Sequence, residues 1–324
     1  MASNKEAKLD RFDRYLPVEP WVNPWQADGS YRPDLDLLTT LLTVAAGTPQ
    51  QSGIVAAAAD VWAAEELRRA GFDPDEVWPR RSKPRVLPRD VRNFVEGGAL
   101  TKKLRADVEE RLTHSKARKA LPAEAHVLGS AYSKQADVVV ASWAAGVELL
   151  ISTKTMLSSY QKNLRNRFEE GYGDAKNLRG RHPLAALGFL YLVGADIPEV
   201  GLDFAIDMLR KLVREPDVYE CACLLIIEGA HVDEDDTDEE ARGPEEAPAL
   251  VPIQTDEDDE EDLTEDAAER DAPAPSPEAV RLLSEKVPSD LSPSTFFERL
   301  IAAALDRMPV AVYPSVRARI AHSS

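Results

Sequence analysis

The clearest pattern of apolar and polar positions lies in the middle of the chain. Two short apolar runs, 136–141 and 147–153, are rich in β-branched residues, and the segment 142–146 between them ends in Gly146. β-branched residues suit a pleated, half-buried surface, so the pattern predicts two strands joined as a hairpin. We expect a helix over 155–172, directly after the second strand.

The segments that follow alternate between apolar runs and an amphipathic stretch. Continuous apolar runs at 183–193 and 218–227 predict buried strands, and the amphipathic stretch 200–214 between them predicts a helix. This alternation favours an α/β protein in which helices flank a central sheet. Further helices are expected at 35–46, 53–70 with Ser52 as its cap and Gly71 at its end, 92–119 with an interruption near Gly97 and Gly98, 122–134, 277–286 and 293–307.

These elements suggest four regions. We expect a mainly helical N-terminal region with a basic patch over 1–120 and an α/β core over 121–231. An acidic linker follows over 232–277, and a C-terminal helical segment covers 278–324. The apolar stripe from Phe296 to Leu305 predicts packing against the main domain, with a dimer seam as the alternative.

Charge is distributed unevenly along the chain. The net charge is −18, and the segment 233–271 alone holds twenty acidic residues and two Arg. The rest of the chain is balanced, with 37 Lys plus Arg against 37 Asp plus Glu. The acidic segment has too little apolar surface to offset its chain entropy, so we expect disorder. Three roles are open: a solvating linker, a mimic of DNA charge that restrains DNA binding, and a docking site for a basic protein partner.

A basic stretch occupies 80–119, with thirteen Lys and Arg against five acidic residues. Such a surface suits contacts with nucleic-acid phosphates. The alternatives are a solvated basic surface and a docking site for the acidic segment. We favour nucleic acid, because the stretch directly precedes the predicted core.

Several classes of protein are disfavoured by the sequence. No run of 18 apolar residues occurs, and the charged segment 1–10 lacks the apolar core of a signal peptide, so we expect a cytoplasmic protein without a membrane span. Cys221 and Cys223 lie in an apolar, strand-like run and are expected to be buried free thiols. The glycines form no phosphate-cradling motif, which argues against nucleotide hydrolysis.

Candidate chemistry gathers on the predicted hairpin and the helix after it. Asp137 begins the first strand, and Ser152 and Lys154 end the second, where a spacing of two residues places them on one face. Glu169 and Glu170 follow on the helix. Mg²⁺ prefers oxygen ligands, and a Lys beside an attacking water stabilises charge or helps to remove a proton. These residue types therefore suit hydrolysis of a phosphodiester.

At these residues the segment 136–182 resembles the PD-(D/E)xK nuclease superfamily, the fold of many restriction endonucleases. The usual signature is an Asp at the start of one strand, then an acidic residue, any residue and Lys on the next. Asp137 and Lys154 match the Asp and the Lys, whereas Ser152 stands at the acidic position. In one branch of restriction enzymes, which cut sites with a CCGG-like core, the motif likewise reads SxK. There a Glu on the following helix supplies the missing carboxylate, as Glu169 or Glu170 would here.

The resemblance implies a restriction-endonuclease-like core, a mixed sheet flanked by helices. It implies a DNA endonuclease that depends on Mg²⁺ or Mn²⁺ and acts in restriction or antiviral defence. Asp137 and Glu169 or Glu170 would hold the metal, Lys154 would position or activate water, and Ser152 would support the metal shell.

Other residues compete for this site or extend it. Glu148 shares the strand face of Ser152 by parity, but four residues of strand, about 13 Å, separate the two. The resemblance also makes Glu124, on the predicted helix 122–134, an additional metal candidate, whereas His126 is expected at a helix surface or core edge. The candidate phosphate-contacting residues are Lys162, Arg165, Arg167 and Lys176.

Two other interpretations are open. A chain that keeps the nuclease fold but has lost catalysis would be a DNA-binding or defence-complex subunit, and Ser152 in place of an acid supports this alternative. A structural subunit that docks through the acidic segment is the third. Because one active site cuts one strand, cleavage of both strands would imply a homodimer.

Overall fold

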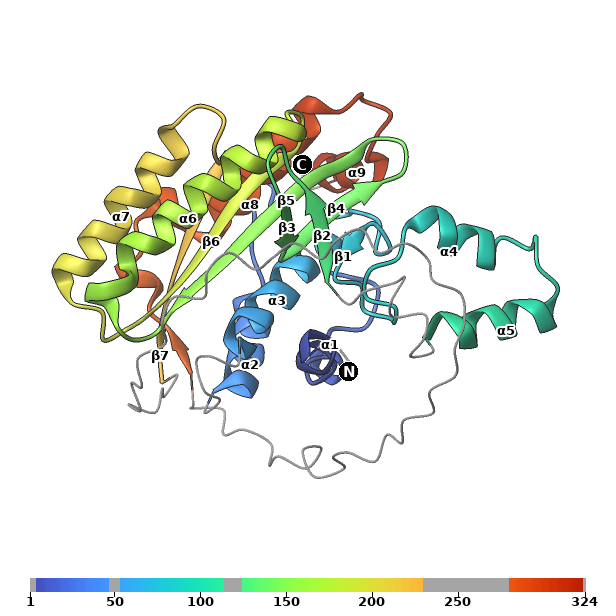
Figure 1. Ribbon diagram of the computed structural model, residues 1–324, viewed down its shortest axis with the longest axis horizontal. Helices are drawn as coiled ribbons and strands as arrows, with labels where there is room; N and C mark the ends of the chain where they lie inside the picture. Colours follow the sequence, from blue (N-terminus) through green and yellow to red (C-terminus); the bar gives the residue numbers. More distant parts are fainter. Residues whose placement is uncertain (1–3, 47–52, 114–123, 230–279, 323–324) are drawn as a thin grey trace.

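A mixed six-stranded sheet forms the centre of the molecule. The computed structural model describes residues 4–46, 53–113, 124–229 and 280–322. The strands lie in the order β1-β4-β5-β6-β7-β8 (Figure 1), and only β5 with β6 and β6 with β7 are parallel neighbours. The strand bounds are Val77–Trp78 for β1, Val138–Ser142 for β4, Gly146–Met156 for β5, Ala186–Gly194 for β6, Cys221–Glu228 for β7 and Arg281–Leu282 for β8. The predicted α/β class with a mixed, helix-flanked sheet is confirmed.

The predicted hairpin is confirmed as β4 and β5. The turn between them reaches Gly146 at φ +76°, a left-handed conformation that glycine adopts at little cost. Val139 pairs with Leu150, but the register shifts by one residue after Val140. Glu148 is therefore an extra residue in β5, a β-bulge that reverses the alternation of side chains before it.

Two helices cover one face of the sheet. Helix α6 (Tyr160–Arg181) connects β5 to β6, and helix α7 (Glu199–Arg214) connects β6 to β7, as parallel neighbours require. Every residue of β6 is buried, because the sheet is covered on both faces. The strands and the helix predicted in this region are confirmed, and so are the buried free thiols of Cys221 and Cys223 on β7.

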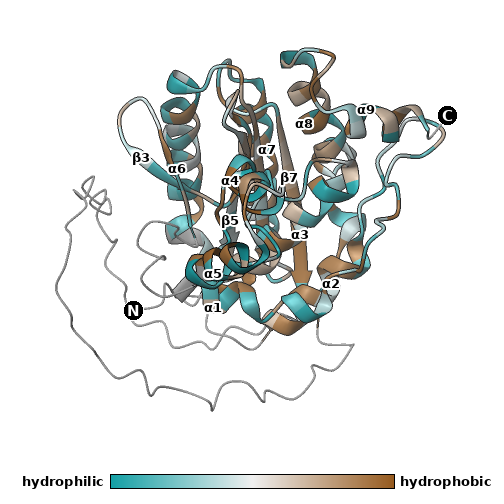
Figure 2. Ribbon diagram, turned by 90° about the vertical axis from the view of Figure 1, so that its right-hand side faces the viewer, coloured by the Kyte–Doolittle hydropathy of each residue, from teal (hydrophilic) through white to brown (hydrophobic). Residues whose placement is uncertain are grey.

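The opposite face is covered by helices α2 (Leu35–Ala45), α3 (Ile54–Ala70) and α8 (Pro293–Arg307) (Figure 2). The stripe of α8 packs into this core, as predicted, and Phe296 lies so close to Gly188 that a Cβ there would meet its ring at 2.8 Å. Ser292 caps α8 by accepting a hydrogen bond from the backbone N–H of Thr295. The predicted cap Ser52 of α3 lies outside the described residues.

The N-terminal part of the chain also contributes to the sheet, through the edge strand β1. The predicted interruption near Gly97 and Gly98 is confirmed. Helices α4 (Arg89–Glu96) and α5 (Lys102–Thr113) form a projecting pair (Figure 1), which we call the arm, and 114–119 lies outside the described residues. The remaining helices are α1 (Asn4–Asp10) and α9 (Pro314–Ala321), with short 3₁₀ turns η1 (Asp13–Tyr15), η5 (Ser284–Lys286) and η6 (Ser289–Leu291).

The predicted helix at 122–134 is wrong. Residues from 124 onward form a two-stranded hairpin of β2 (Ala125–Leu128) and β3 (Ser133–Ala136). Ala125 and Val127 are buried while His126 and Leu128 are exposed, an alternation with a period of two that marks a strand. This hairpin packs on the same face of the sheet as α6.

Two further boundaries differ from the predictions. Helix α6 begins at Tyr160, because β5 continues to Met156 beside β6. The predicted helix 277–286 is replaced from 280 onward by the edge strand β8 and a 3₁₀ turn. The acidic linker predicted at 232–277 lies outside the described residues. In the part of the chain that the structure describes, no helix is long and apolar enough to cross a membrane.

Candidate active site

Asp137 lies at the point where the chain leaves one hairpin and enters the next. The preceding strand β3 pairs with β2, and the following strand β4 pairs with β5. The backbone N–H of Thr153 on β5 donates a 2.8 Å hydrogen bond to Asp137 Oδ2. The carboxylate of Asp137 is therefore fixed beside the backbone of Thr153, the residue that precedes Lys154.

Lys154 and Glu170 form an ion pair between β5 and α6. Lys154 Nζ donates to Glu170 Oε2 at 3.1 Å, and Arg167 Nη1 lies 3.2 Å from the same oxygen. The Lys154 side chain is largely buried, whereas that of Glu170 is 46 % exposed. Burial raises the pKa of Glu170, but Lys154 and Arg167 outweigh it and leave the pKa below its ordinary value. Glu170 is thus held ionised at the strand end that carries Asp137.

The two neighbouring glutamates of α6 have different surroundings. Glu169 pairs with Arg165, one turn earlier on the exposed side of the helix, at 2.9 Å. It lines an open groove between α6 and α7, together with Phe168 and Phe204. Adjacent residues of a helix point about 100° apart, so only one of the two can face Lys154. The structure brings Glu170 to that position.

Ser152 is buried and turned toward Tyr219, the residue two positions before β7. Its side chain is hydrogen-bonded to the phenol of Tyr219, and this phenol donates to the carbonyl of Gly171 at 3.0 Å. Burial raises the pKa of Tyr219 far above its ordinary value, so the phenol keeps its proton. The chain of hydrogen bonds from Ser152 to Gly171 ties the strand of Lys154 to the helix of Glu170.

A second polar group joins α6 to the β2–β3 hairpin. Asp174 is buried and accepts from Tyr132 Oη at 3.1 Å, and Lys134 Nζ lies 2.8 Å from its other oxygen. Asn177 Oδ1 accepts the backbone N–H of Ala131 at 2.8 Å. Burial first, and the charge of Asp174 next, raise the pKa of Tyr132 to about 12. We did not select these residues from the sequence, although Asp174 and Asn177 follow Glu170 at helical spacing.

The position of Glu148 differs from the prediction. The bulge turns its side chain to the opposite face of the sheet, where the hydroxyl of Tyr313 donates to it. Glu148 therefore does not share the face of Ser152 and Lys154. Glu124 precedes the strand β2 rather than lying on a helix, and its Oε2 is 3.7 Å from His126 Nε2.

The candidate phosphate-contacting residues are spread along α6. Arg165 is 81 % exposed and Arg167 is 39 % exposed, next to Glu169 and Glu170 respectively. Lys176 donates instead to the carbonyl of Pro216 at 2.7 Å and lies over the ring of Tyr172. The side chain of Lys162 lies outside the described part of the molecule.

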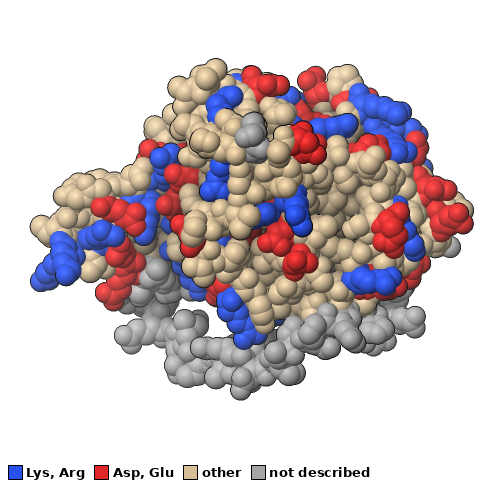
Figure 3. Space-filling model, turned by 180° about the vertical axis from the view of Figure 1, so that it is seen from behind, with Lys and Arg blue, Asp and Glu red and all other residues tan. Residues whose placement is uncertain are grey.

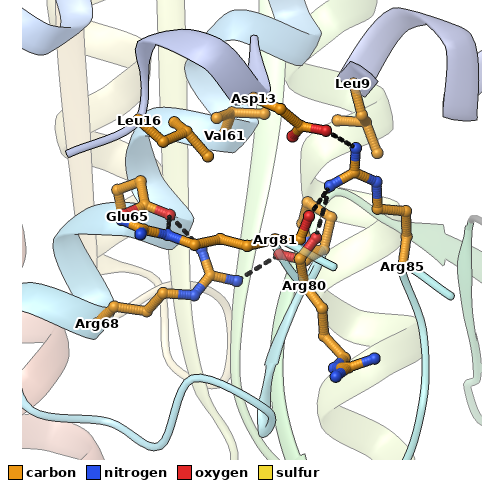
Figure 4. A pocket seen from close by; sticks show the side chains of 10 residues that line it. Leu9, Asp13, Leu16, Val61, Glu65, Arg68, Arg80, Arg81 and Arg85 are labelled. Carbon is orange, nitrogen blue, oxygen red and sulfur yellow. Dashed lines mark hydrogen bonds and ion pairs between the residues drawn. The ribbon is translucent and has the colours of Figure 1, made fainter. Parts of the chain in front are cut away.

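Three arginines at the start of the predicted basic patch are held in ion pairs within the fold, whereas Lys83 and Arg89 are exposed. In Figure 4, Arg85 points toward Asp13 and Arg81 toward Glu65, beside α1 and α3. Arg80 and Arg85 are buried and pair with Asp75 and Asp13, at 2.5 and 2.6 Å. Arg81 pairs with Glu65, and its guanidinium lies over the ring of Trp21. These three arginines are therefore engaged by carboxylates of the protein itself.

The arm carries cations and anions side by side (Figure 3). Two of its arginines pair within the arm, Arg105 with Glu109 at 3.0 Å and Arg111 with Asp107 at 3.2 Å, whereas Arg89 pairs with Glu76 outside it at 2.8 Å. Lys102 is exposed at the start of α5. Within the described residues, 80–113 is thus not a surface of one sign.

The residues at the end of β5 fit a hard cation by their chemistry. In the ranges that the structure describes, no three His, Cys, Asp or Glu side chains gather as a metal-binding group. Mg²⁺, however, is commonly held through one or two carboxylates together with substrate phosphates and water. Asp137 and Glu170 supply two such carboxylates, on either side of Lys154.

Comparisons of the chain with family models, with curated proteins and with solved structures gave no match. The functional argument therefore depends on the residues themselves.

Proposed function

We propose that the protein is a metal-dependent DNA endonuclease with a restriction-endonuclease-like core. The observation that carries the proposal is the contact of Lys154 with Glu170 beside the fixed carboxylate of Asp137. An Asp at a strand start and a Lys at the end of the paired strand are the parts of the motif that match. The carboxylate of Glu170, which lies on α6 beside Lys154, supports the SxK variant of the motif. Glu170 then has the metal-binding role that the sequence left open between Glu169 and Glu170.

Each side chain has a defined task in this proposal. A bound Mg²⁺ would polarise the phosphate and make water a better nucleophile. Asp137 and Glu170 would hold that ion, and the Lys154 ammonium would stabilise the negative charge that develops on the phosphate oxygens. The water oxygen would form the new bond to phosphorus as the bond to the bridging oxygen breaks; the water gives up one proton, and the leaving oxygen takes one up. Arg165 and Arg167 grip neighbouring phosphates of the backbone.

Ser152 has a supporting role in this scheme. Its hydroxyl is engaged by Tyr219, so it acts on the site through the position of Gly171 and the adjacent Glu170. Ser152 also favours the alternative function, a DNA-binding or defence-complex subunit without catalysis, because a hydroxyl stands on the strand where the usual motif has a carboxylate. Defence against foreign DNA is the setting that the resemblance implies for either function.

The test is cleavage of plasmid and phage DNA by purified protein with Mg²⁺ or Mn²⁺. We expect Asp137→Ala and Glu170→Gln to lower the cleavage rate by about 10²–10³-fold, the effect of removing one group that stabilises the transition state. Glu169→Gln is the matched control, because the same change one residue earlier leaves the contact with Lys154 intact. Mn²⁺ binding without DNA, measured by electron paramagnetic resonance, gives a second readout.

The outcomes separate the two functions. Cleavage lost in Glu170→Gln and kept in Glu169→Gln supports the nuclease. Equal loss in both variants contradicts the assignment of Glu170. No metal binding and no cleavage by the wild type, together with a salt-dependent gel shift on DNA, would leave the binding subunit.

A further inference from the structure

Helix α6 carries two carboxylates that each meet a lysine from the strands beside it, and the proposed site uses only one of these pairs. Glu170 and Asp174 are four residues apart, so their side chains lie on one face of α6, about 6 Å apart along the helix axis. Glu170 pairs with Lys154 of β5, and Asp174 pairs with Lys134 of β3. We call the pair of Lys134 and Asp174 the second pair, because it repeats the first one turn further along α6.

The second pair is held more firmly than an ordinary surface ion pair. The Asp174 side chain is only 7 % exposed, and Tyr132 Oη donates to its Oδ1 at 3.1 Å. Its other oxygen lies 2.8 Å from Lys134 Nζ. A buried charge is costly unless a partner compensates it, so Asp174 requires the ammonium of Lys134 at this position. The carboxylate therefore fixes the cation in one place.

The ammonium of Lys134 can still bind an incoming anion. The Lys134 side chain is 28 % exposed, compared with 17 % for Lys154. A lysine ammonium has three N–H donors, and Asp174 is the one carboxylate that pairs with Lys134 among the described residues. Lys134 also lies three residues before Asp137, the fixed carboxylate of the candidate site. A partly exposed cation is thus held beside that site.

Tyr219 links the second pair to the candidate site. Its phenol donates to the carbonyl of Gly171, which lies between Glu170 and Asp174 on α6. Burial has the largest effect in raising the pKa of this phenol, and the charges of Asp174 and Asp137 raise it further. Both carboxylates therefore lie near Tyr219. The second pair belongs to the same polar cluster as the candidate site.

We propose that Lys134 binds a backbone phosphate of the DNA strand that Lys154 contacts, and that Asp174 positions Lys134 for this contact. The 6 Å along α6 corresponds to about two nucleotide steps of about 3.4 Å along one strand of duplex DNA. The scissile phosphate at Lys154 and a phosphate about two nucleotides away would then meet the two ammonium groups together. The β2–β3 hairpin is in this arrangement a substrate-binding element, and the DNA strand follows α6 toward its C-terminal end. This inference rests on the proposed nuclease function, because the phosphate at Lys154 sets the register.

The experiment measures the binding of duplex DNA to the full chain between about 50 and 200 mM NaCl. Ca²⁺ replaces Mg²⁺, because it is held by the same kind of oxygen ligands, and a gel checks that the DNA stays uncut. The test variant is Lys134→Met/Asp174→Asn, which keeps the net charge and leaves no unpaired buried charge. We expect the slope of log K against log[NaCl] to become shallower by about 0.9, the value of one phosphate contact. Affinity at about 0.1 M salt should fall by about five- to tenfold.

The matched control is Lys211→Met/Asp207→Asn. It makes the same two substitutions in an ion pair of the neighbouring helix α7, where Lys211 Nζ lies 2.6 Å from Asp207 Oδ2. This control should keep the slope of the wild type.

Two single variants separate the phosphate contact from stability. Lys134→Arg retains a cation and should keep the slope. Lys134→Met alone leaves Asp174 buried and unpaired, so its midpoint of urea denaturation should fall below that of the double variant.

The outcomes distinguish this inference from the proposed function. A wild-type slope in Lys134→Met/Asp174→Asn, while the wild type binds and cuts DNA, overturns the phosphate contact and leaves the nuclease standing. An equal change in the α7 control also overturns it, because the effect is then not specific to Lys134. A shallower slope in the test variant alone supports the contact even if the wild type does not cut, in which case the proposed nuclease activity fails by itself. A wild type that binds no DNA overturns both.

Discussion

The two ends of β5 carry opposite chemistry on one continuous strand. At the Lys154 end, a carboxylate, an amine and a second carboxylate from α6 are held together by hydrogen bonds. At the Gly146 end, the neighbouring turn exposes Trp143 and carries no charge. Each end also has one tyrosine whose hydroxyl fixes a distant segment: Tyr219 at the first and Tyr313 at the second. A rigid strand thus separates the candidate reaction site from an uncharged turn, so that each can be changed alone.

The largest effect is expected from Tyr219→Phe. The change keeps the ring against Phe189 but leaves the Ser152 hydroxyl and the Gly171 carbonyl without this partner. Unsatisfied buried groups of this kind cost about 1–3 kcal/mol, so the free energy of unfolding should fall by that amount in urea denaturation. Mn²⁺ affinity and the turnover number should fall as well, because Glu170 is no longer held beside Lys154.

The double variant Ser152→Ala/Tyr219→Phe sharpens this prediction. If the two hydroxyls form one chain of hydrogen bonds, removing both costs less than the sum of the single changes. Additive losses of stability would contradict the link between β5 and α6. Unchanged Mn²⁺ affinity in Tyr219→Phe would leave Tyr219 a purely structural residue.

Tyr313→Phe tests the other end with the same substitution and a smaller effect. Tyr313 donates to the buried carboxylate of Glu148 and precedes α9. Loss of its hydroxyl should lower the free energy of unfolding by about 1–3 kcal/mol. We expect the lower part of this range, because the phenyl ring keeps its contact with Phe72. The α8–α9 loop loses an anchor. DNA cleavage per folded molecule should not change. A loss of Mn²⁺ binding in this variant would break the separation between the two ends.

Elements that depend on local sequence patterns were predicted, whereas an element that depends on packing between distant segments was missed. Short apolar runs rich in β-branched residues identified β4 and β5, and continuous apolar runs identified β6 and β7. Amphipathic spacing identified α7 and α8. The β2–β3 hairpin was missed because a short stretch of Ala, Glu and Leu also suits a helix, and the alternation of Ala125 and Val127 covers only four residues. The helix propensity of the segment was overridden by its packing against α6.

The candidate site was predictable only in part for the same reason. Asp137 and Lys154 are brought together by hairpin pairing, which sequence spacing encodes. The choice of Glu170 over Glu169 depends on the rotation of α6 over the sheet. Tyr219 reaches Ser152 from the segment that precedes β7, a strand that β6 separates from β5. A bulge moved Glu148 to the other face, because one inserted residue reverses the parity of a strand. Likewise, the charge of Arg85 was visible in the sequence, but its burial beside Asp13 was not.

The smallest expected effect concerns the protonation of Glu170. Burial raises its pKa, whereas Lys154 and then Arg167 lower it further than burial raises it. A carboxyl whose pKa is lower in the folded state contributes stability above its unfolded pKa, and this contribution is lost as the pH falls through the folded pKa. The carboxylate of Glu170 should therefore remain ionised, and Mn²⁺ binding should persist, at pH 5. Replacing Lys154 by Met removes the main opposing charge, so the pKa of Glu170 should rise.

Side-chain ¹³C NMR of labelled glutamate measures this shift directly. The midpoint of the Glu170 signal should move to higher pH in Lys154→Met than in the wild type. Arg165→Met is the control, because Arg165 pairs with Glu169 and not with Glu170. A midpoint that moves equally in both variants would show that net charge alone sets the titration. A midpoint that moves only in Lys154→Met would show that the charge of Lys154 lowers the pKa of Glu170. The proposed reaction requires this ionised carboxylate beside the amine of Lys154.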